Sequence, residues 1–336
     1  MTSDVIVIGG GVIGLTTAVV LAESGLRTGV WSRDPAADTT SAVAGGLWWP
    51  YRIEPLERVG RWSLETLREL TALAAPDPLG AAGAAGPGDE PDGPGPTGVR
   101  LAEGTMCGTG LADVAAWAAE VPGLRTAAPH ELPDGVGRGL RARVPLVDMP
   151  AYLAYLRRRL EAAGGTVEAR TATSLAEAAG HAPTVVNCAG LGARELVPDP
   201  AVRPVQGQLV IVANPGVTTW TVAADDASSD TTYLLPQPYG LVLGGTARED
   251  AWDTEPDPAT AEAIIARCAR FHPEVAGAEV LRHRVGLRPA RAEVRLAVEE
   301  LPDGARVVHN YGHGGAGVTV SWGCAREAAR LADRTG

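Results

Sequence analysis

The sequence predicts an α/β protein in two parts, a parallel sheet flanked by helices and a second, β-rich part. Residues 4–8 are a β-branched run typical of a buried strand, residues 12–24 have helical spacing, and residues 28–31 form another strand, which together predict a βαβ unit. Residues 208–244 instead carry strand patterns broken by proline and glycine. Because the chain of 336 residues is longer than an ordinary domain, we expect two domains.

The other segments complete this division. We predict strands at residues 141–147, 166–169, 184–187, 279–287 and 307–309, and helices at residues 62–73, 149–163, 258–271 and from the C-terminal glycines to residue 333. The dinucleotide-binding domain is expected to be discontinuous, with residues 1–75, 141–195 and 300–336, and the second domain to hold residues 76–140 and 196–299. Residues 76–98 are almost wholly proline, glycine, alanine and acid, which predicts a mobile surface loop.

Composition excludes several classes of partner. The formal net charge of −11 argues against nucleic acid and against an acidic membrane surface. No apolar run reaches the roughly 18 residues of a bilayer-spanning helix, and the first residues lack a leader pattern. The four cysteines are far apart, with no metal-binding spacing, so we expect no metal and a reduced, cytoplasmic protein, with a homodimer as its expected assembly.

A glycine motif follows the first predicted strand directly. In GGGVIG, Gly9 permits the turn, Gly11 lets the backbone approach a pyrophosphate, and Gly14 allows close packing of helix on sheet. The helix is expected to begin at Val12 and Ile13, whose backbone amides would face the pyrophosphate. The second strand ends in Ser-Arg-Asp. Asp34 is a candidate for the ribose hydroxyls, and Arg33 could instead accept a 2′-phosphate, so this end of the site leaves the cofactor open.

A second glycine cluster lies near the C-terminus. HNYGHGGAGVTVSWGCA, residues 309–325, places Gly312, Gly314, Gly315 and Gly317 before a predicted helix. Glycine is favoured where the backbone needs a positive φ or must approach a ligand closely. A nicotinamide dinucleotide gives no reason for a second cluster, whereas a flavin ring needs backbone donors of this kind, so the two clusters together favour FAD.

The C-terminal stretch resembles the signature of the D-amino acid oxidase family. VGLRPARAEVRL (residues 285–296), TTSAVAGGLWWPY (residues 39–51) and VNCAGLGA (residues 186–193) resemble other motifs of that family, in the family's order, and the likeness spans residues 4–329 except 76–98. It implies a non-covalent FAD that takes a hydride from the α-carbon of a D-amino acid and passes the electrons to O2. The products would be a 2-oxo acid, ammonia and hydrogen peroxide.

The resemblance also implies roles for individual residues. Arg291 matches the arginine that binds the substrate carboxylate, Tyr233 the tyrosine that shares it, and Gly315 the glycine whose carbonyl accepts from the amino group. Arg288 is the leading rival for the arginine, and Tyr233 could instead be an ordinary half-buried strand residue. The expected FAD contacts are Gly9, Gly11, Val12, Ile13, Gly14, Arg33, Asp34, Thr39, Thr40, Gly45, Gly46, Ala172, Gly190, Gly314, Gly315, Gly317, Val318 and Thr319.

Three residues expected to line the pocket and three acids bear on which substrate the protein prefers. Leu47, Trp49 and Tyr51 are expected to wall the pocket, although Trp49 could equally be core. The acids Asp225, Asp226 and Asp230 precede Tyr233, where they would disfavour a second substrate carboxylate, so neutral or cationic D-amino acids are expected to be preferred. Alternatives are a D-aspartate oxidase, or a related flavin dehydrogenase.

Two positions differ from many relatives of that family, and two histidines need an assignment. Ser229 stands where vertebrate relatives have a second lid tyrosine, and Gln206 where many relatives have a basic or other polar residue. We expect His309 and His313 to be structural rather than catalytic, because hydride transfer needs no base of that kind.

Overall fold

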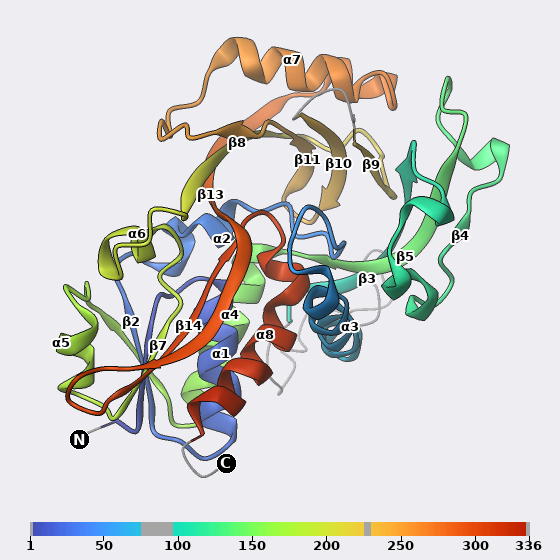
Figure 1. The fold of residues 1–336 in the computed structure, drawn as a ribbon. Helices are drawn as coiled ribbons and strands as arrows, with labels where there is room; N and C mark the ends of the chain where they lie inside the picture. The colour runs from blue at the N-terminus through green and yellow to red at the C-terminus, as the bar shows by residue number, and fades with distance from the viewer. Residues whose placement is uncertain (1–2, 75–96, 225–229, 334–336) are drawn as a thin grey trace, which may run out of the picture.

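The computed structural model describes residues 3–74, 97–224 and 230–333 (Figure 1). The loop predicted at residues 76–98 therefore lies almost entirely outside the described residues. One large mixed sheet runs through the described part of the chain, and the predicted α/β class is confirmed.

One end of this sheet is parallel and is built from segments far apart in the chain. In spatial order its strands are β14 (Arg306–His313), β7 (Thr184–Asn187), β1 (Val5–Ile8), β2 (Thr28–Ser32) and β6 (Thr166–Ala169). Every residue of β1 is buried, as its unbroken VIVI run predicts for a central parallel strand. Because these strands are parallel, the turns that follow them meet at one edge of the sheet.

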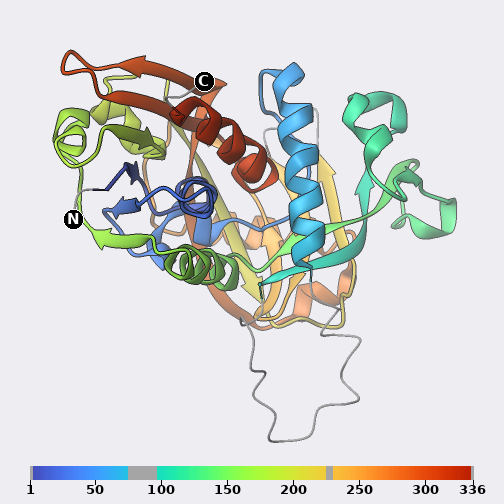
Figure 2. The same cartoon turned by 90° about the horizontal axis from the view of Figure 1, so that it is seen from below.

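Helices cover both faces of the parallel end. Val5 and Val7 point into the core shared with α1 (Val12–Glu23), α4 (Met149–Ala162) and α8 (Gly317–Ala332), and α3 (Leu56–Leu73) packs beside α8 (Figures 1 and 2). Ile6 and Ile8 point to the other face, where α5 (Leu175–Ala179) lies. The short helices α2 (Thr40–Val43) and α6 (Ala193–Leu196) connect the two parts of the molecule.

The other end of the sheet is mainly antiparallel. Its strands are β3 (Val99–Cys107), β4 (Arg125–Thr126), β5 (Gly139–Val147), β8 (Arg203–Val212), β9 (Trp220–Ala224), β10 (Thr231–Gln237), β11 (Gly240–Gly244) and β12 (Arg248–Glu249). The helix α7 (Pro258–Cys268) covers β8, β10 and β11. We grouped residues 141–147 with the dinucleotide-binding segments, but β5 pairs antiparallel with β3. The domain boundaries themselves stay a prediction.

A single long strand joins the two ends of the sheet. The strand β13 (Val280–Glu300) pairs first with β8 and then with β14, and so extends well beyond the predicted residues 279–287. Both strand pairings are antiparallel, which allows β13 to carry the chain from the β-rich part directly into the parallel part. Residues near the middle of β13, where its pairing passes from β8 to β14, therefore lie at the junction of the two parts.

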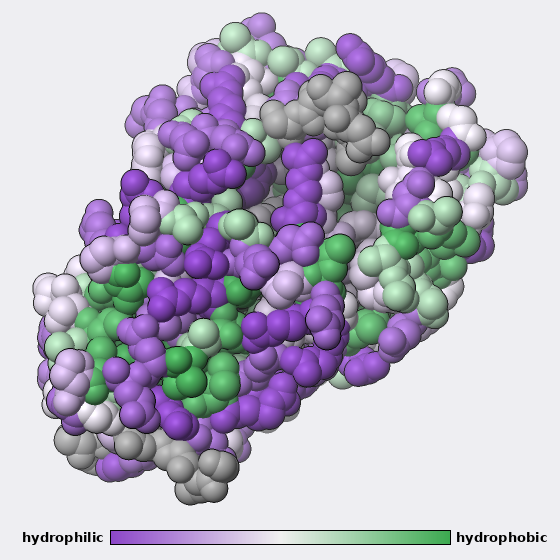
Figure 3. All heavy atoms as spheres, viewed as in Figure 1, coloured by the Kyte–Doolittle hydropathy of each residue, from purple (hydrophilic) through white to green (hydrophobic). Residues whose placement is uncertain are grey.

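The surface is largely hydrophilic on the face drawn in Figure 3, where hydrophilic residues separate the hydrophobic groups. No helix within residues 3–74, 97–224 and 230–333 combines the length and the apolar character needed to cross a bilayer.

Candidate active site

The first glycine motif forms a tight turn between β1 and α1. Gly9 has φ +114, and a Cβ there would collide with the carbonyl oxygen of Cys188. A Cβ at Gly14 would collide with the carbonyl oxygen of Gly9, which is the close helix–strand packing that the motif predicts. At Gly11 a Cβ would lie 3.0 Å from the hydroxyl of Ser41.

The second glycine cluster meets the first, although about 300 residues separate them in sequence. A Cβ on Gly317 would lie 3.8 Å from Cγ1 of Val12 and 3.9 Å from the side chain of Ile13, so the N-termini of α1 and α8 converge. Neither helix has a side-chain cap at its N-cap residue, Gly11 or Ala316. The first-turn amides of a helix have no partner within the helix and carry its positive dipole end. The two ends therefore form a cradle that suits an anionic dinucleotide such as FAD.

Ser41 is a site residue that sequence reasoning missed. Its hydroxyl accepts a hydrogen bond from the amide of Val12 at 2.9 Å and so occupies part of the α1 cap. Ser32, at the end of β2, was missed as well: its side chain packs against Gly10, where a Cβ would collide with it. No motif marks a lone serine as a neighbour of the cradle.

Arg33 and Asp34 pair with one another directly after β2. The Arg33 guanidinium lies 2.8 Å from the Asp34 carboxylate, and both side chains are exposed. The pair neutralises much of the positive charge that a 2′-phosphate would need. Ala172, another expected contact, packs with the apolar side chains beneath α5.

Several other expected cofactor contacts also have structural roles. The Thr39 hydroxyl donates to the carbonyl of Ala36, and the Thr40 hydroxyl donates to the carbonyl of Leu287 at 3.1 Å, which ties α2 to β13. The Thr319 hydroxyl bonds to the backbone of Trp49. These residues can therefore offer their backbone, but their hydroxyls already have partners.

Glycine at positions 45, 46 and 190 is explained by packing within the protein. A Cβ on Gly45 would lie 2.6 Å from Leu235, and one on Gly46, which has φ +83, would collide with the carbonyl of Val147. Gly190 has φ +58 and faces Pro289 of β13. Val318 is buried in the core of α8. Contacts or backbone conformation within the protein thus account for glycine at these three positions, and their roles as cofactor contacts stay a prediction.

Arg288, Tyr233 and Gly315 come together at the junction between the two parts. The Arg288 guanidinium donates to the carbonyl of Thr246 at 2.9 Å and lies over Gly207, where a Cβ would collide with it. A Cβ on Gly315 would lie 3.4 Å from Cδ of Arg288. Burial raises the pKa of Tyr233 and the nearby charge of Arg288 opposes that shift, so the phenol stays protonated near neutral pH.

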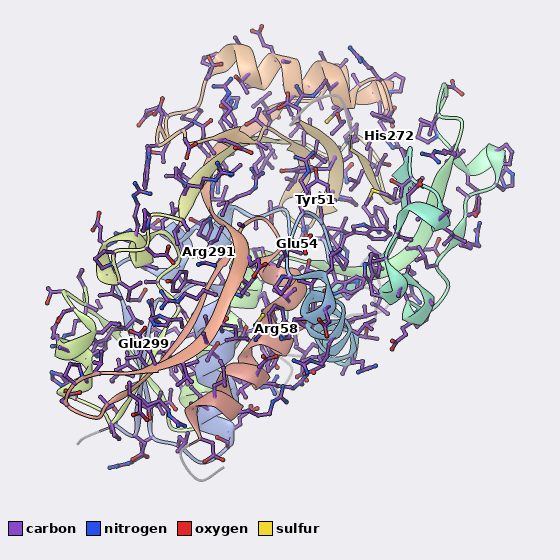
Figure 4. All side chains as sticks on the ribbon, in the orientation of Figure 1. Tyr51, Glu54, Arg58, His272, Arg291 and Glu299 are labelled. Carbon is purple, nitrogen blue, oxygen red and sulfur yellow. The ribbon has the colours of Figure 1, made fainter. Side chains whose placement is uncertain are left out.

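The structure does not bring Arg291, the arginine expected to bind the substrate carboxylate, to this site. Arg288 and Arg291 are three positions apart on β13, and an odd spacing directs side chains to opposite faces of a strand. The Arg291 Nε donates to Asp199 at 3.2 Å, and its Nη1 donates to the carbonyl of Glu293. In Figure 4, Arg291 lies on the side of β13 toward α6, and Tyr51 lies on the other side.

Charge pairing also distinguishes the two arginines. The charge of Arg291 is already compensated by Asp199. Among the described residues, no carboxylate lies within salt-bridge distance of Arg288. A partly buried guanidinium with no carboxylate partner is the better site for a substrate carboxylate.

The three residues expected to line the substrate pocket differ in how far they are buried. Trp49 is buried, edge-on to Trp117 and tilted against Trp220, so its side chain belongs to the core. Leu47 is partly buried beside the same core. Tyr51 is 38% exposed, with its hydroxyl 3.5 Å from that of Thr231 on β10. Of the three, Tyr51 is thus the one that reaches the strand carrying Tyr233.

The residues expected at the pocket mouth are only partly described. Asp225, Asp226 and Ser229 lie outside the described residues. Asp230 forms an ion pair of 3.1 Å with Arg267. Gln206 is buried and donates to the carbonyl of Asp253.

Both histidines of the C-terminal stretch are buried. Burial lowers the pKa of His313 to about 3, so the imidazole is neutral near pH 7. Burial and the charge of Arg295 lower the pKa of His309 despite the neighbouring Glu299, whose carboxylate is 3.2 Å away. These surroundings favour structural roles. All four cysteines are free and buried, and the described residues contain no cluster that could hold a metal ion.

The chain is similar to several known proteins over nearly its whole length. A family model described as FAD dependent oxidoreductase matches residues 4–331. A D-amino-acid oxidase of Streptomyces coelicolor is 62% identical, covering 98% of this chain and 96% of its own, and one of Rubrobacter xylanophilus is 49% identical, covering 97% and 95%. The solved structure of glycine oxidase from Geobacillus kaustophilus has a TM-score of 0.76 at 19% identity, covering 99% of this chain and 95% of its own, which shows a shared fold.

Proposed function

Since the chain belongs to the family of FAD dependent oxidoreductases, we propose that it catalyses the oxidative deamination of D-amino acids. The cradle formed by the N-termini of α1 and α8 would hold FAD, which would supply a two-electron acceptor that O2 can reoxidise. The imino acid hydrolyses to a 2-oxo acid and ammonia. The observation that carries the proposal is the Arg288–Tyr233–Gly315 cluster beside the α8 N-terminus.

Arg288 binds the substrate carboxylate in this proposal. Its planar guanidinium offers parallel donors that match two carboxylate oxygens, and its charge has no carboxylate partner in the described part of the chain. The carbonyl of Thr246 takes one donor of Nη1 and so fixes the plane of the group. This is a change from Arg291, which the resemblance alone favoured.

Tyr233 and Gly315 complete the contacts to the reacting end of the substrate. The protonated Tyr233 hydroxyl donates to the same carboxylate, and the Gly315 carbonyl accepts from the amino group. A side chain at position 315 would reach toward Arg288, so glycine keeps this space open. With the carboxylate and the amine held, an acceptor on one face of the α-carbon would receive the α-hydrogen of only one enantiomer, so selection of D over L would come from geometry rather than from a catalytic base.

Neutral and cationic D-amino acids are the proposed preferred substrates. The acids that precede Tyr233 in the sequence support this preference, because they would repel a second substrate carboxylate. Two observations work against it, because Asp230 is paired with Arg267, and the Arg52 guanidinium lies 5.0 Å from the ring centre of Tyr51. A cation beside Tyr51 would favour D-aspartate, which keeps a D-aspartate oxidase as the second candidate.

We also propose a cytoplasmic location and a dimeric assembly. Four free cysteines are consistent with a reducing, cytoplasmic environment. We propose a homodimer as the state in solution, to be measured by analytical ultracentrifugation of the FAD-loaded protein.

The proposed activity is tested by product stoichiometry. The FAD-loaded protein is incubated in air with D-alanine or L-alanine, and pyruvate, ammonia and hydrogen peroxide are measured. One equivalent of each from D-alanine alone supports an oxidase. Pyruvate that forms only when an artificial electron acceptor is added would identify a dehydrogenase, and no pyruvate from any D-amino acid would refute the proposal.

A further inference from the structure

Asp199, in the turn between α6 and β8, is a buried carboxylate that several elements share. It is 8% exposed. Its Oδ2 accepts from the Tyr311 hydroxyl at 2.8 Å and from Arg291 Nε at 3.2 Å, and its Oδ1 accepts from the amide of Ala201 at 3.0 Å. Nη1 of Arg295 lies 3.8 Å from the same Oδ2. None of these groups contacts the Arg288 side of β13, so their role is not binding of the substrate itself.

The two arginines stand at the ends of an irregularity in β13. Ala290 pairs with His313 and Arg295 pairs with Tyr311, so an advance of five residues along β13 is matched by an advance of two residues along β14. The extra residues form a bulge, which bends a strand and redirects its side chains. Asp199 holds Arg291, just after the regular pairing ends, and lies beside Arg295, where the pairing resumes.

The bulge begins directly after the segment that carries Arg288. The amide of Gly314 donates to the carbonyl of Pro289 at 2.9 Å, which fixes the Gly315 turn against the neighbour of Arg288. Gly312 has φ +89, and a Cβ there would lie 2.8 Å from Cβ of Arg291. The position of Arg291 is therefore coupled by packing to the turn that presents Gly315.

We propose that Asp199 is a positioning residue for substrate binding, which holds Arg291 and Arg295 and thereby keeps both Arg288 and Gly315 in the positions that bind the substrate. The inference rests on the proposed function, because a D-amino acid needs its carboxylate and its amino group engaged at once. Burial alone would raise the pKa of Asp199, but the Tyr311 hydroxyl, the Ala201 amide and the Arg291 charge together lower it, so the carboxylate is ionised at neutral pH.

The test uses Asp199→Asn in the FAD-loaded enzyme. Asparagine keeps the size of the side chain and an acceptor for the Ala201 amide, but it removes the charge that pairs with Arg291. The expected result is an unchanged FAD content, a KM for D-alanine and a Kd for benzoate each raised about tenfold or more, and a kcat changed less than about threefold. Benzoate is a carboxylate without an amino group, and its binding is read from the flavin absorption spectrum without turnover.

Further variants and a control keep the test decisive. Tyr311→Phe removes one hydrogen bond to Asp199 and should raise both constants in the same direction by a smaller factor. Combining Asp199→Asn with Arg291→Gln should cost no more than the larger single change, because both act through one contact. Arg282→Leu, at an exposed position of β13 outside the network, is the control and should leave both constants unchanged.

The outcomes are distinct. A wild-type enzyme that does not oxidise D-alanine refutes the proposed function. An active wild type with unaltered KM and benzoate Kd in Asp199→Asn refutes the positioning role. If Asp199→Asn fails to retain FAD, Tyr311→Phe decides, and wild-type constants in that variant overturn the inference.

Discussion

The guanidinium of Arg288 donates to the carbonyl oxygen of Thr246 at 2.9 Å, and its odd spacing from Arg291 places the two side chains on opposite faces of β13. This contact holds Arg288 next to Tyr233 and Gly315 while leaving its charge without a carboxylate partner in the described residues. The arrangement accounts for recognition of the substrate carboxylate, and it identifies the arginine to be tested.

Arg288→Lys should lose at least about 2 kcal/mol of transition-state binding, roughly thirtyfold in kcat/KM, because lysine keeps the charge but not the bidentate geometry. Arg291→Lys should stay within about threefold of wild type, since lysine can keep an ion pair with Asp199. Steady-state kinetics with D-alanine compare the two. The reverse ranking of the two variants would restore Arg291 as the carboxylate-binding residue.

Gly14→Ala should impair FAD retention, because the new Cβ would collide with the carbonyl of Gly9 and push α1 away from β1. The FAD content of the purified protein, measured by absorbance, should fall well below one per chain. The matched control is Gly60→Ala in α3, where an added Cβ meets no atom within 4 Å. That change should keep full FAD content and raise stability by up to about 1 kcal/mol. Equal FAD content in the two variants would contradict the role of Gly14.

His313 predicts a specific acid sensitivity. Its folded-state pKa of about 3 is below the usual 6.5, so the unfolded chain binds one more proton between these values. Stability is therefore fully present above pH 6.5 and falls as pH decreases, by about 1.4 kcal/mol per pH unit from this group. Thermal unfolding of FAD-loaded His313→Gln between pH 7 and pH 5 should show a shallower loss than wild type. The exposed His130→Gln serves as control, and identical slopes for wild type and His313→Gln would exclude this explanation.

Substrate preference is measured with four compounds. If the acids before Tyr233 dominate, kcat/KM should be highest for D-alanine, D-methionine or D-lysine, and the penalty against D-aspartate should shrink as salt is added. Two unit charges about 6 Å apart at an effective dielectric of about 20 repel by roughly 3 kcal/mol. D-aspartate as the best of the four would defeat this argument, and Arg52→Ala would then show whether the cation beside Tyr51 is responsible.

The fold and the cofactor cradle could be largely predicted from sequence because they depend on local patterns. The buried VIVI strand, the glycines at 9, 11 and 14 and the glycines before α8 each specify backbone geometry by residue type. Convergence of the two glycine clusters followed from the common edge of a parallel sheet. These features need no knowledge of side-chain partners.

The choice between Arg288 and Arg291 could not be made from sequence. It depends on which face of β13 each side chain occupies and on Asp199, which is 92 positions away from Arg291 in the chain. Ser41 and Thr246 were missed for the same reason, because their contacts with Val12 and Arg288 are tertiary. Trp49 was ambiguous until its packing against Trp117 and Trp220 was known.

The central claim is that bound FAD takes a hydride from D-amino acids held by this cluster, and anaerobic mixing measures that step without O2. The FAD-loaded protein is mixed with excess D-alanine or L-alanine, and the oxidised flavin band is followed by stopped-flow absorbance. The account predicts rapid and complete bleaching with D-alanine, none with L-alanine, and severely slowed bleaching in Arg288→Lys at low substrate. Bleaching by L-alanine at a comparable rate, or no bleaching by any D-amino acid, would contradict it.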